Sequence, residues 1–171
     1  MNHLNIEIKA RSNNQDAIRK ILQKQGADFK GIDHQVDTYF RVPHGRLKLR
    51  EGNIENYLIH YQREETQGLK SSIIKLFTLP ANSNLKEILS DALGIFAVVD
   101  KKREIYFIEN VKFHIDTVEN LGDFIEIEAL DKNGTIGKEK LTKQCNFYIK
   151  LLDVQKNDLV AASYSDLILE R

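Results

Sequence analysis

Charged side chains in this sequence recur at every second position along segments that alternate between polar and apolar residues. Glu7 and Lys9 stand on the polar side of such a segment near the N-terminus, and Glu126 and Glu128 stand together on another. Because side chains two positions apart point to the same face of a β-strand, each pair shares one face. Arg11 shares the face of Glu7 and Lys9, and the basic residues in strand phase on other segments are Arg46, Lys48, Arg50, Arg63, Lys70, Lys101 and Arg103.

Carboxylates and cations sorted in this way suit a site for a metal ion and a polyphosphate. Lys and Arg neutralise phosphate groups, and Arg adds bidentate geometry. Carboxylates repel phosphates unless a divalent cation lies between them, and Mg²⁺ is usually held by one or two carboxylates together with phosphate oxygens. His114 and Asp116 share a further strand face, so His114 is also a candidate site residue. The alternative interpretation is that these are solvated strand faces linked by cross-strand salt bridges.

The elements that must position these side chains are mainly strands. Alternation of apolar and polar residues predicts eight of them, at 3–11, 35–42, 46–51, 56–64, 70–79, 98–108, 111–118 and 123–130. Apolar spacing of three and four residues predicts four helices, at 15–25, 83–93, 136–152 and 159–169. Because strands follow one another without regular intervening helices, we expect an α+β fold, an antiparallel β-barrel or strongly curved sheet with flanking helices. Closing the sheet into a barrel would gather the charged faces inside.

Length and composition indicate one globular domain over residues 1–171. Lys+Arg and Asp+Glu balance at 25 each, so no overall field attracts nucleic acid or a membrane surface, and neither is expected as a partner. The single cysteine, Cys145, excludes an internal disulfide and is expected in the core. A secretory signal and an apolar stretch of about 20 residues are both missing, which predicts a cytoplasmic protein.

An ordered set of short motifs resembles the CYTH superfamily, also called the triphosphate tunnel metalloenzymes. Asn5-Ile-Glu-Ile-Lys9 is similar to the family's Glu-x-Glu-x-Lys signature. The further matches, in the family's order, are Asp37-Thr-Tyr-Phe40, Gly45-Arg-Leu-Lys-Leu-Arg50, Tyr61-Gln-Arg63, Val99-x-Lys101-x-Arg103-x-x-Tyr106, His114-Ile-Asp116, Leu121-Gly-Asp-Phe-Ile-Glu126-Ile-Glu128 and Ser163-Tyr-Ser-Asp-Leu167. The Asp-Thr-Tyr-Phe and Ser-Tyr-Ser-Asp-Leu segments look most like the CyaB-type branch, the class IV adenylyl cyclases.

The resemblance implies an eight-stranded antiparallel barrel that forms a tunnel, and Mg²⁺ or Mn²⁺ as the cofactor. The metal ligands that it implies are Glu7, Asp116, Glu126 and Glu128. The catalytic residues that it implies are Glu7, Lys9, Glu126 and Glu128. The triphosphate contacts that it implies are Lys9, Lys48, Arg50, Arg63, Lys101 and Arg103. The chain departs from the signature at Asn5, whose neutral carbonyl oxygen can bind a cation or hold a water but supplies no charge.

Three activities remain open at this point. Resemblance favours a class IV adenylyl cyclase, which converts ATP to cyclic AMP and pyrophosphate. The first alternative is a triphosphatase acting on tripolyphosphate, thiamine triphosphate or a nucleoside triphosphate, since the metal and phosphate residues would look alike in both enzymes. The second is a module that binds polyphosphate or nucleotide without turnover, for which Asn5 is the one indication. The expected partner is therefore a small triphosphate, and resemblance alone implies a homodimer.

Overall fold

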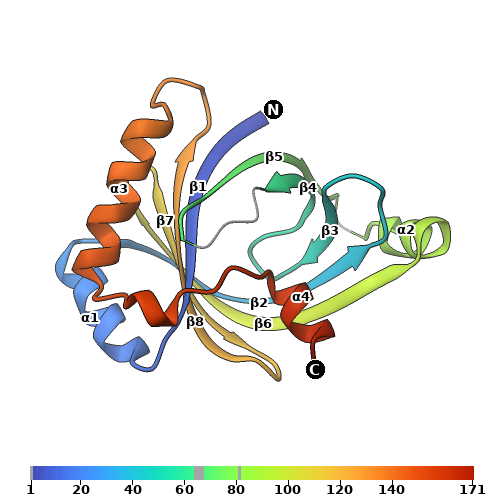
Figure 1. The fold of residues 1–171 in the computed structure, drawn as a ribbon. Coiled ribbons are helices and arrows are strands. Elements are labelled where there is room, and N and C mark those ends of the chain that lie inside the picture. Colours follow the sequence, from blue (N-terminus) through green and yellow to red (C-terminus); the bar gives the residue numbers. More distant parts are fainter. Residues whose placement is uncertain (1, 64–67, 81) are drawn as a thin grey trace.

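The computed structural model describes residues 2–63, 68–80 and 82–171. Eight antiparallel strands close into a barrel in the order β1-β5-β4-β3-β2-β6-β7-β8 (Figure 1). The strands are β1 (Asn2–Arg11), β2 (Asp28–Phe40), β3 (Arg46–Glu51), β4 (Tyr57–Arg63), β5 (Lys70–Thr78), β6 (Ile95–Ile108), β7 (Val111–Val118) and β8 (Gly122–Asp131). The helices are α1 (Gln15–Lys24), α2 (Leu85–Leu93), α3 (Lys138–Leu151), a 3₁₀ turn η1 (Lys156–Asp158) and α4 (Tyr164–Leu169). The predicted barrel with flanking helices is confirmed.

Two elements differ from their predicted bounds by five residues or more. β2 begins at Asp28 rather than at position 35, and its register against β6 shifts between Phe29 and Gly31. Such an irregularity breaks the alternation of the pattern, which hides the first half of the strand in the sequence. The C-terminal helix begins at Tyr164 rather than at 159, because Ser163 and Asp166 form a capping box.

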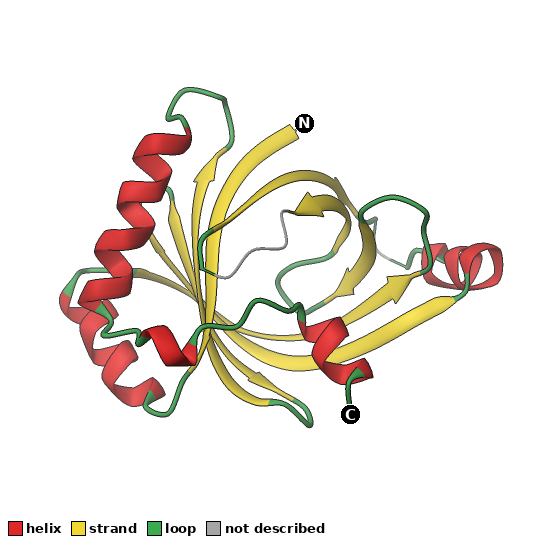
Figure 2. Cartoon of the chain, viewed as in Figure 1, coloured by secondary structure: helices red, strands yellow, loops and turns green. Residues whose placement is uncertain are grey.

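The apolar faces of β1, β7 and β8 point away from the barrel axis. α1 and α3 cover this outer surface, side by side along one flank of the barrel (Figure 2). The core between helices and strands includes Ile6, Ile8, Phe113, Ile127, Leu22, Leu141 and Cys145, all at most 4% exposed. None of the helices in the described parts of the chain has the length and apolar character that crossing a membrane requires.

The polar faces of β1, β7 and β8 consequently point inward, toward the barrel axis. One end of the barrel is crossed by residues 159–169, which we call the C-terminal strap (Figure 1). The Val160 N–H donates to the Lys9 carbonyl at 2.9 Å, and the Lys70 ammonium donates to the Val160 carbonyl at 3.2 Å. The opposite end, where β4 and β7 begin and β5, β6 and β8 finish, is called the mouth. The charged interior therefore lies between a closed end and the mouth.

Candidate metal and triphosphate site

The barrel interior contains a cavity of about 330 Å³. Of the ten site residues that the family resemblance implies, nine line this cavity, and Asp116 is the exception. The lining carboxylates are Glu7, Asp37, Glu55, Glu126 and Glu128, and the lining cations are Lys9, Lys48, Arg50, Arg63, Lys101, Arg103, Lys112 and Lys132. Cations thus outnumber carboxylates among the described lining residues, which suits an anionic ligand.

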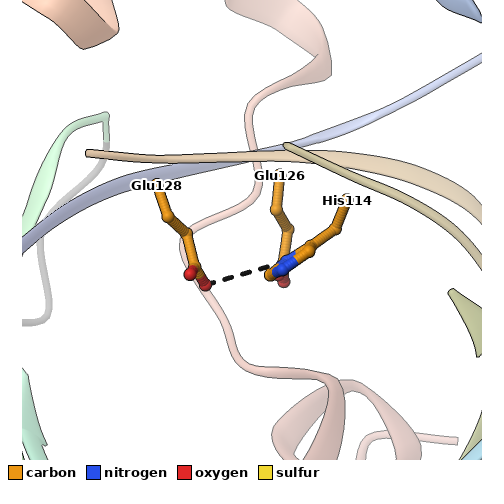
Figure 3. A group of neighbouring side chains, drawn as sticks. All are labelled: His114, Glu126 and Glu128. Carbon is orange, nitrogen blue, oxygen red and sulfur yellow. Dashed lines mark hydrogen bonds and ion pairs between the residues drawn. The ribbon is translucent and has the colours of Figure 1, made fainter. Parts of the chain in front are cut away.

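Strand register brings the acidic residues together on one wall. Glu7 of β1 lies opposite Glu128 of β8, Lys9 lies opposite Glu126, and His114 of β7 lies opposite Glu126 from the other side. His114, Glu126 and Glu128 project from their strands in the same direction and their tips converge (Figure 3). One ligand atom from each lies within 4.8 Å of the other two.

Each member of this wall has a different protonation tendency. Burial and the neighbouring carboxylate of Glu7 raise the pKa of Glu128 to about 7. Burial opposes ionisation of Glu126, but Arg103 and Lys9 outweigh burial and hold its pKa well below its usual range. Burial, together with the positive charge of Arg103, lowers the pKa of His114 to about 3, so its ring is neutral at pH 7. Two carboxylates that disfavour each other beside a neutral imidazole form a site that a cation would stabilise.

Two buried acceptor atoms beside this wall have no hydrogen-bond partner among the residues that the structure describes. The Nδ1 atom of His114 lies 2.9 Å from Glu126 Oε2, so a neutral ring that donates this hydrogen leaves Nε2 as an unpaired acceptor. Asn5 is fully buried and donates through Nδ2 to Glu7 Oε2 at 3.1 Å, which leaves its Oδ1 unpaired. Buried polar atoms are rarely left unpaired. Carboxylate, amide and imidazole donors together fit Mg²⁺ or Mn²⁺, so the residues present agree with the implied metal.

The basic residues occupy the remaining walls. Asp37 of β2 gathers three of them: Lys48 at 3.0 Å, Arg50 at 2.8 and 2.9 Å, and Lys101 at 2.8 Å. Burial, with smaller contributions from nearby cations, lowers the pKa of Lys101 to about 7, although Asp37 opposes the change. Arg63 is paired more loosely, with 3.5 Å between its Nη1 atom and Glu7 Oε1. An anion entering the cavity would meet these cations already held in place.

The predicted metal ligand Asp116 is not brought to the cavity. It is fully buried, and its two oxygens accept from Arg103 Nε at 2.7 Å and from Arg103 Nη2 at 2.5 Å. The Tyr164 hydroxyl of the strap adds a third hydrogen bond at 2.8 Å. The geometry therefore favours a role for Asp116 in positioning Arg103 over a role as a metal ligand.

Asp37, Lys112 and Glu55 form ion pairs inside the cavity but were not among the predicted site residues. Asp37 stands in strand phase with the buried Tyr39, so its inward position was readable from the alternation. Lys112 precedes His114 by two positions and follows the same rule. Glu55 lies in the loop between β3 and β4, where strand phase carries no information. Only the closed barrel reveals that Glu55 reaches Arg50 and Lys112.

Comparison with known proteins agrees with this architecture. The model of the CYTH domain matches residues 3–164. The protein named "Putative adenylate cyclase MJ0240" from Methanocaldococcus jannaschii is 24% identical, with 96% of this chain and 98% of that protein covered. The PH1012 protein of Pyrococcus horikoshii OT3 is 27% identical, with a TM-score of 0.75 over 95% of this chain and 98% of the other.

A third similarity is to a protein from Hippeastrum. The Hippeastrum protein HpAC1, whose structure is described as that of a "Putative adenylyl cyclase" with "a dominant triphophatase activity", is 12% identical. Its TM-score is 0.62 over 98% of this chain and 95% of the other, which shows a shared fold. Because the family model spans nearly the whole barrel, the chain belongs to the CYTH domain family.

Proposed function

We propose that this protein is a divalent-metal-dependent enzyme that acts on a triphosphate inside the barrel, most like a class IV adenylyl cyclase. The observation that carries the proposal is the convergence of His114, Glu126 and Glu128 on one wall of a cavity whose other walls are lined with cations. Family membership supports it, because CYTH proteins are typically metal-dependent enzymes acting on triphosphates.

Glu7, Glu126 and Glu128 would hold Mg²⁺ or Mn²⁺, with His114 and Asn5 beside them as further donors. A bound divalent cation would neutralise charge on the phosphates and polarise their oxygens. The chain's own contribution is positioning and electrostatic stabilisation, which dominate catalysis of phosphoryl transfer. The side chains that would grip the phosphates are Lys9, Lys48, Arg50, Arg63, Lys101 and Arg103.

Lys9 is well placed for a direct role at the closed end. Its Nζ atom lies 3.2 Å from Glu126 Oε1 and 3.8 Å above the centre of the Tyr164 ring. The aromatic face and the carboxylate together hold the ammonium in one position. Lys9 would therefore couple the metal-binding wall to the phosphate that lies nearest the strap.

Two reactions fit these roles. In the cyclase, the ribose 3′ oxygen attacks the α-phosphorus of ATP, the bond from that phosphorus to the bridging oxygen breaks, and pyrophosphate leaves. In a triphosphatase, water attacks the terminal phosphorus, the bond from that phosphorus to the bridging oxygen breaks, the diphosphate leaves, and the attacked phosphorus becomes orthophosphate. The name of the Methanocaldococcus relative favours the cyclase, whereas the activity described for the Hippeastrum protein favours the triphosphatase.

Product analysis separates the two reactions. The purified protein is incubated with Mg²⁺ or Mn²⁺ and with ATP or tripolyphosphate, and the products are resolved by ³¹P NMR and chromatography. Cyclic AMP with pyrophosphate establishes the cyclase, and orthophosphate release establishes the triphosphatase. Absence of turnover with either substrate would leave a binding module as the better description.

A matched pair of variants ties turnover to the site. Glu128→Gln removes a charge from the wall formed by His114, Glu126 and Glu128, whereas Glu139→Gln removes a charge from the exposed surface of α3. We expect Glu128→Gln to lower kcat by at least about a hundredfold, the scale seen when a group that stabilises transition-state charge is removed. Glu139→Gln should keep full activity, and equal activity in both variants would refute the site assignment.

A further inference from the structure

Glu55 connects two walls of the cavity near the mouth. Its Oε2 atom accepts from Arg50 Nη1 of β3 at 2.9 Å, and its Oε1 atom contacts Lys112 Nζ of β7. The Glu55 side chain has only 12% of its surface exposed. A carboxylate supplied by the protein thus occupies two cations that a phosphate would otherwise reach.

The loop that carries Glu55 is fixed by a buried carboxylate on β2. Asp33 is fully buried and accepts the backbone N–H groups of residues 53–55 at 2.6, 2.9 and 3.0 Å. Gln35 donates to Asp33 Oδ2 at 2.7 Å and to Glu55 Oε2 at 3.2 Å. A Cβ atom on Gly52 would lie 2.7 Å from Asp33, so the loop packs closely against this carboxylate. These hydrogen bonds to Asp33 therefore fix the loop and hold Glu55 in position.

The character of the cavity changes at Glu55. The side chains that face the cavity near the mouth are chiefly apolar or aromatic: Tyr57, Ile59, Ile74, Leu76, Phe107 and Leu130. His3, at the start of β1, and Lys132, just after β8, also line this end. Apolar side chains offer no partner to a phosphate but gain from contact with an organic group. Lys9 lies at the strap end of the cavity, with its Nζ atom 3.8 Å from the centre of the Tyr164 ring and 3.2 Å from Glu126, whereas Arg50, near the end of β3, lies beside Glu55.

We propose that Glu55 sets the outer limit of the phosphate-binding part of the cavity, so that the site selects a triphosphate whose far end carries a non-anionic organic group. The inference rests on the proposed function, which places the phosphates among the cations of the inner cavity. A longer anion would meet the carboxylate of Glu55 and then the apolar mouth. An organic group would instead pack against Leu76 and Phe107, with the last phosphate ending at Arg50.

Equilibrium binding tests this selection without requiring turnover. Calorimetry in EDTA compares inorganic tripolyphosphate with ATP and thiamine triphosphate for the wild type, Glu55→Gln and the control Glu51→Gln. Glu51 is the matched control because it pairs with Lys86 on the outside of the barrel. We expect the wild type to bind at least one organic triphosphate tenfold or more tightly than tripolyphosphate. Glu55→Gln should tighten tripolyphosphate at least tenfold and the organic ligand less than threefold, and Glu51→Gln should change neither.

A second pair of variants tests the mouth directly. Leu76→Asn places an amide against the expected organic group, whereas Phe77→Asn makes the same kind of change on the next residue, whose side chain does not line the cavity and is 59% exposed. Leu76→Asn should weaken the organic triphosphate at least fivefold and leave tripolyphosphate within twofold. Phe77→Asn should alter neither affinity.

The outcomes separate this inference from the proposed function. Equal wild-type affinity for tripolyphosphate and both organic ligands, or equal gains in Glu55→Gln, would overturn the role of Glu55 even if the enzyme turns over a triphosphate. Selective binding without any turnover in Mg²⁺ or Mn²⁺ would support the role of Glu55 and refute the enzymatic proposal.

Discussion

Arg103 and Asp116 face each other on β6 and β7 as a two-point ion pair, with 2.7 Å from Nε to Oδ1 and 2.5 Å from Nη2 to Oδ2. The same Nη2 atom lies 2.9 Å from Glu126 Oε2. Arg103 therefore links the buried carboxylate of Asp116 to Glu126, a carboxylate of the candidate metal site. Planar guanidinium geometry makes such a link directional as well as charged.

Asp116→Asn tests whether this carboxylate positions Arg103 or binds metal. We expect the free energy of unfolding to fall by about 3 kcal/mol, because one partner of a buried ion pair is lost. Mg²⁺ affinity should stay within threefold of wild type, as measured by calorimetry alongside denaturant unfolding. Asp123→Asn, at an exposed side-chain hydrogen bond from Thr117, is the control. A loss of Mg²⁺ affinity as large as that of Glu128→Gln would restore Asp116 to the metal ligands.

Glu128→Gln should change stability and metal binding in opposite directions. The raised pKa of Glu128 means that folding favours its protonated form, so the metal-free protein loses stability as pH rises from about 4.5 to 7. Removing the charge should stabilise the metal-free protein at pH 8 by about 1–3 kcal/mol. Mg²⁺ affinity should fall at least tenfold, as thermal unfolding with and without Mg²⁺ would report. A metal-free variant less stable than wild type would contradict this assignment.

We expect Lys101 to make triphosphate binding depend on pH. With its pKa lowered to about 7, its charge is present at pH 6 and largely lost at pH 8.5. The unfolded chain binds this proton up to about pH 10.5, so the contribution of Lys101 to stability becomes more favourable as pH rises from about 7 to 10.5.

Loss of this charge should weaken tripolyphosphate binding about tenfold, since a hydrogen bond from a charged donor contributes about 1.5–3 kcal/mol. Calorimetry in EDTA at several pH values measures the effect. Lys101→Arg keeps its charge throughout and gives the titration of the ligand and of the other cavity groups, such as Glu128. The expectation fails if wild type and Lys101→Arg show the same pH profile.

Asn5→Glu restores the acidic residue of the family signature. The new carboxylate would stand beside Glu7, where Asn5 now donates a hydrogen bond, and repulsion between two buried carboxylates should destabilise the metal-free protein by about 1–3 kcal/mol. Mg²⁺ should then raise the midpoint of thermal unfolding by more in Asn5→Glu than in wild type. Asn5→Gln, which keeps the amide, is the control for side-chain size. An unchanged response to Mg²⁺ would place position 5 outside the metal site.

Strand alternation located most of the fold, and of the ten site residues that the family resemblance selected among the alternating charged residues, nine line the cavity. It worked because the barrel interior is polar, so inward residues such as Lys101 and Glu126 stood out against apolar neighbours. Alternation could not distinguish Asp116 from His114 on the same face, and Asp116, which is paired with Arg103 and Tyr164, does not line the cavity. It was also silent about Glu55, whose loop conformation depends on Asp33, a residue distant in sequence.

The outward apolar faces of β1, β7 and β8 have a consequence for how this barrel can change over time. Ile6, Ile8 and Phe113 anchor the strands against α1 and α3, so cohesion comes from packing outside the barrel. The alternate residues on the same strands, Glu7, Lys9 and His114, face the cavity. Substitution of inward side chains therefore leaves the outer hydrophobic layer untouched. One scaffold could in this way acquire new triphosphate substrates while its folding determinants stay constant.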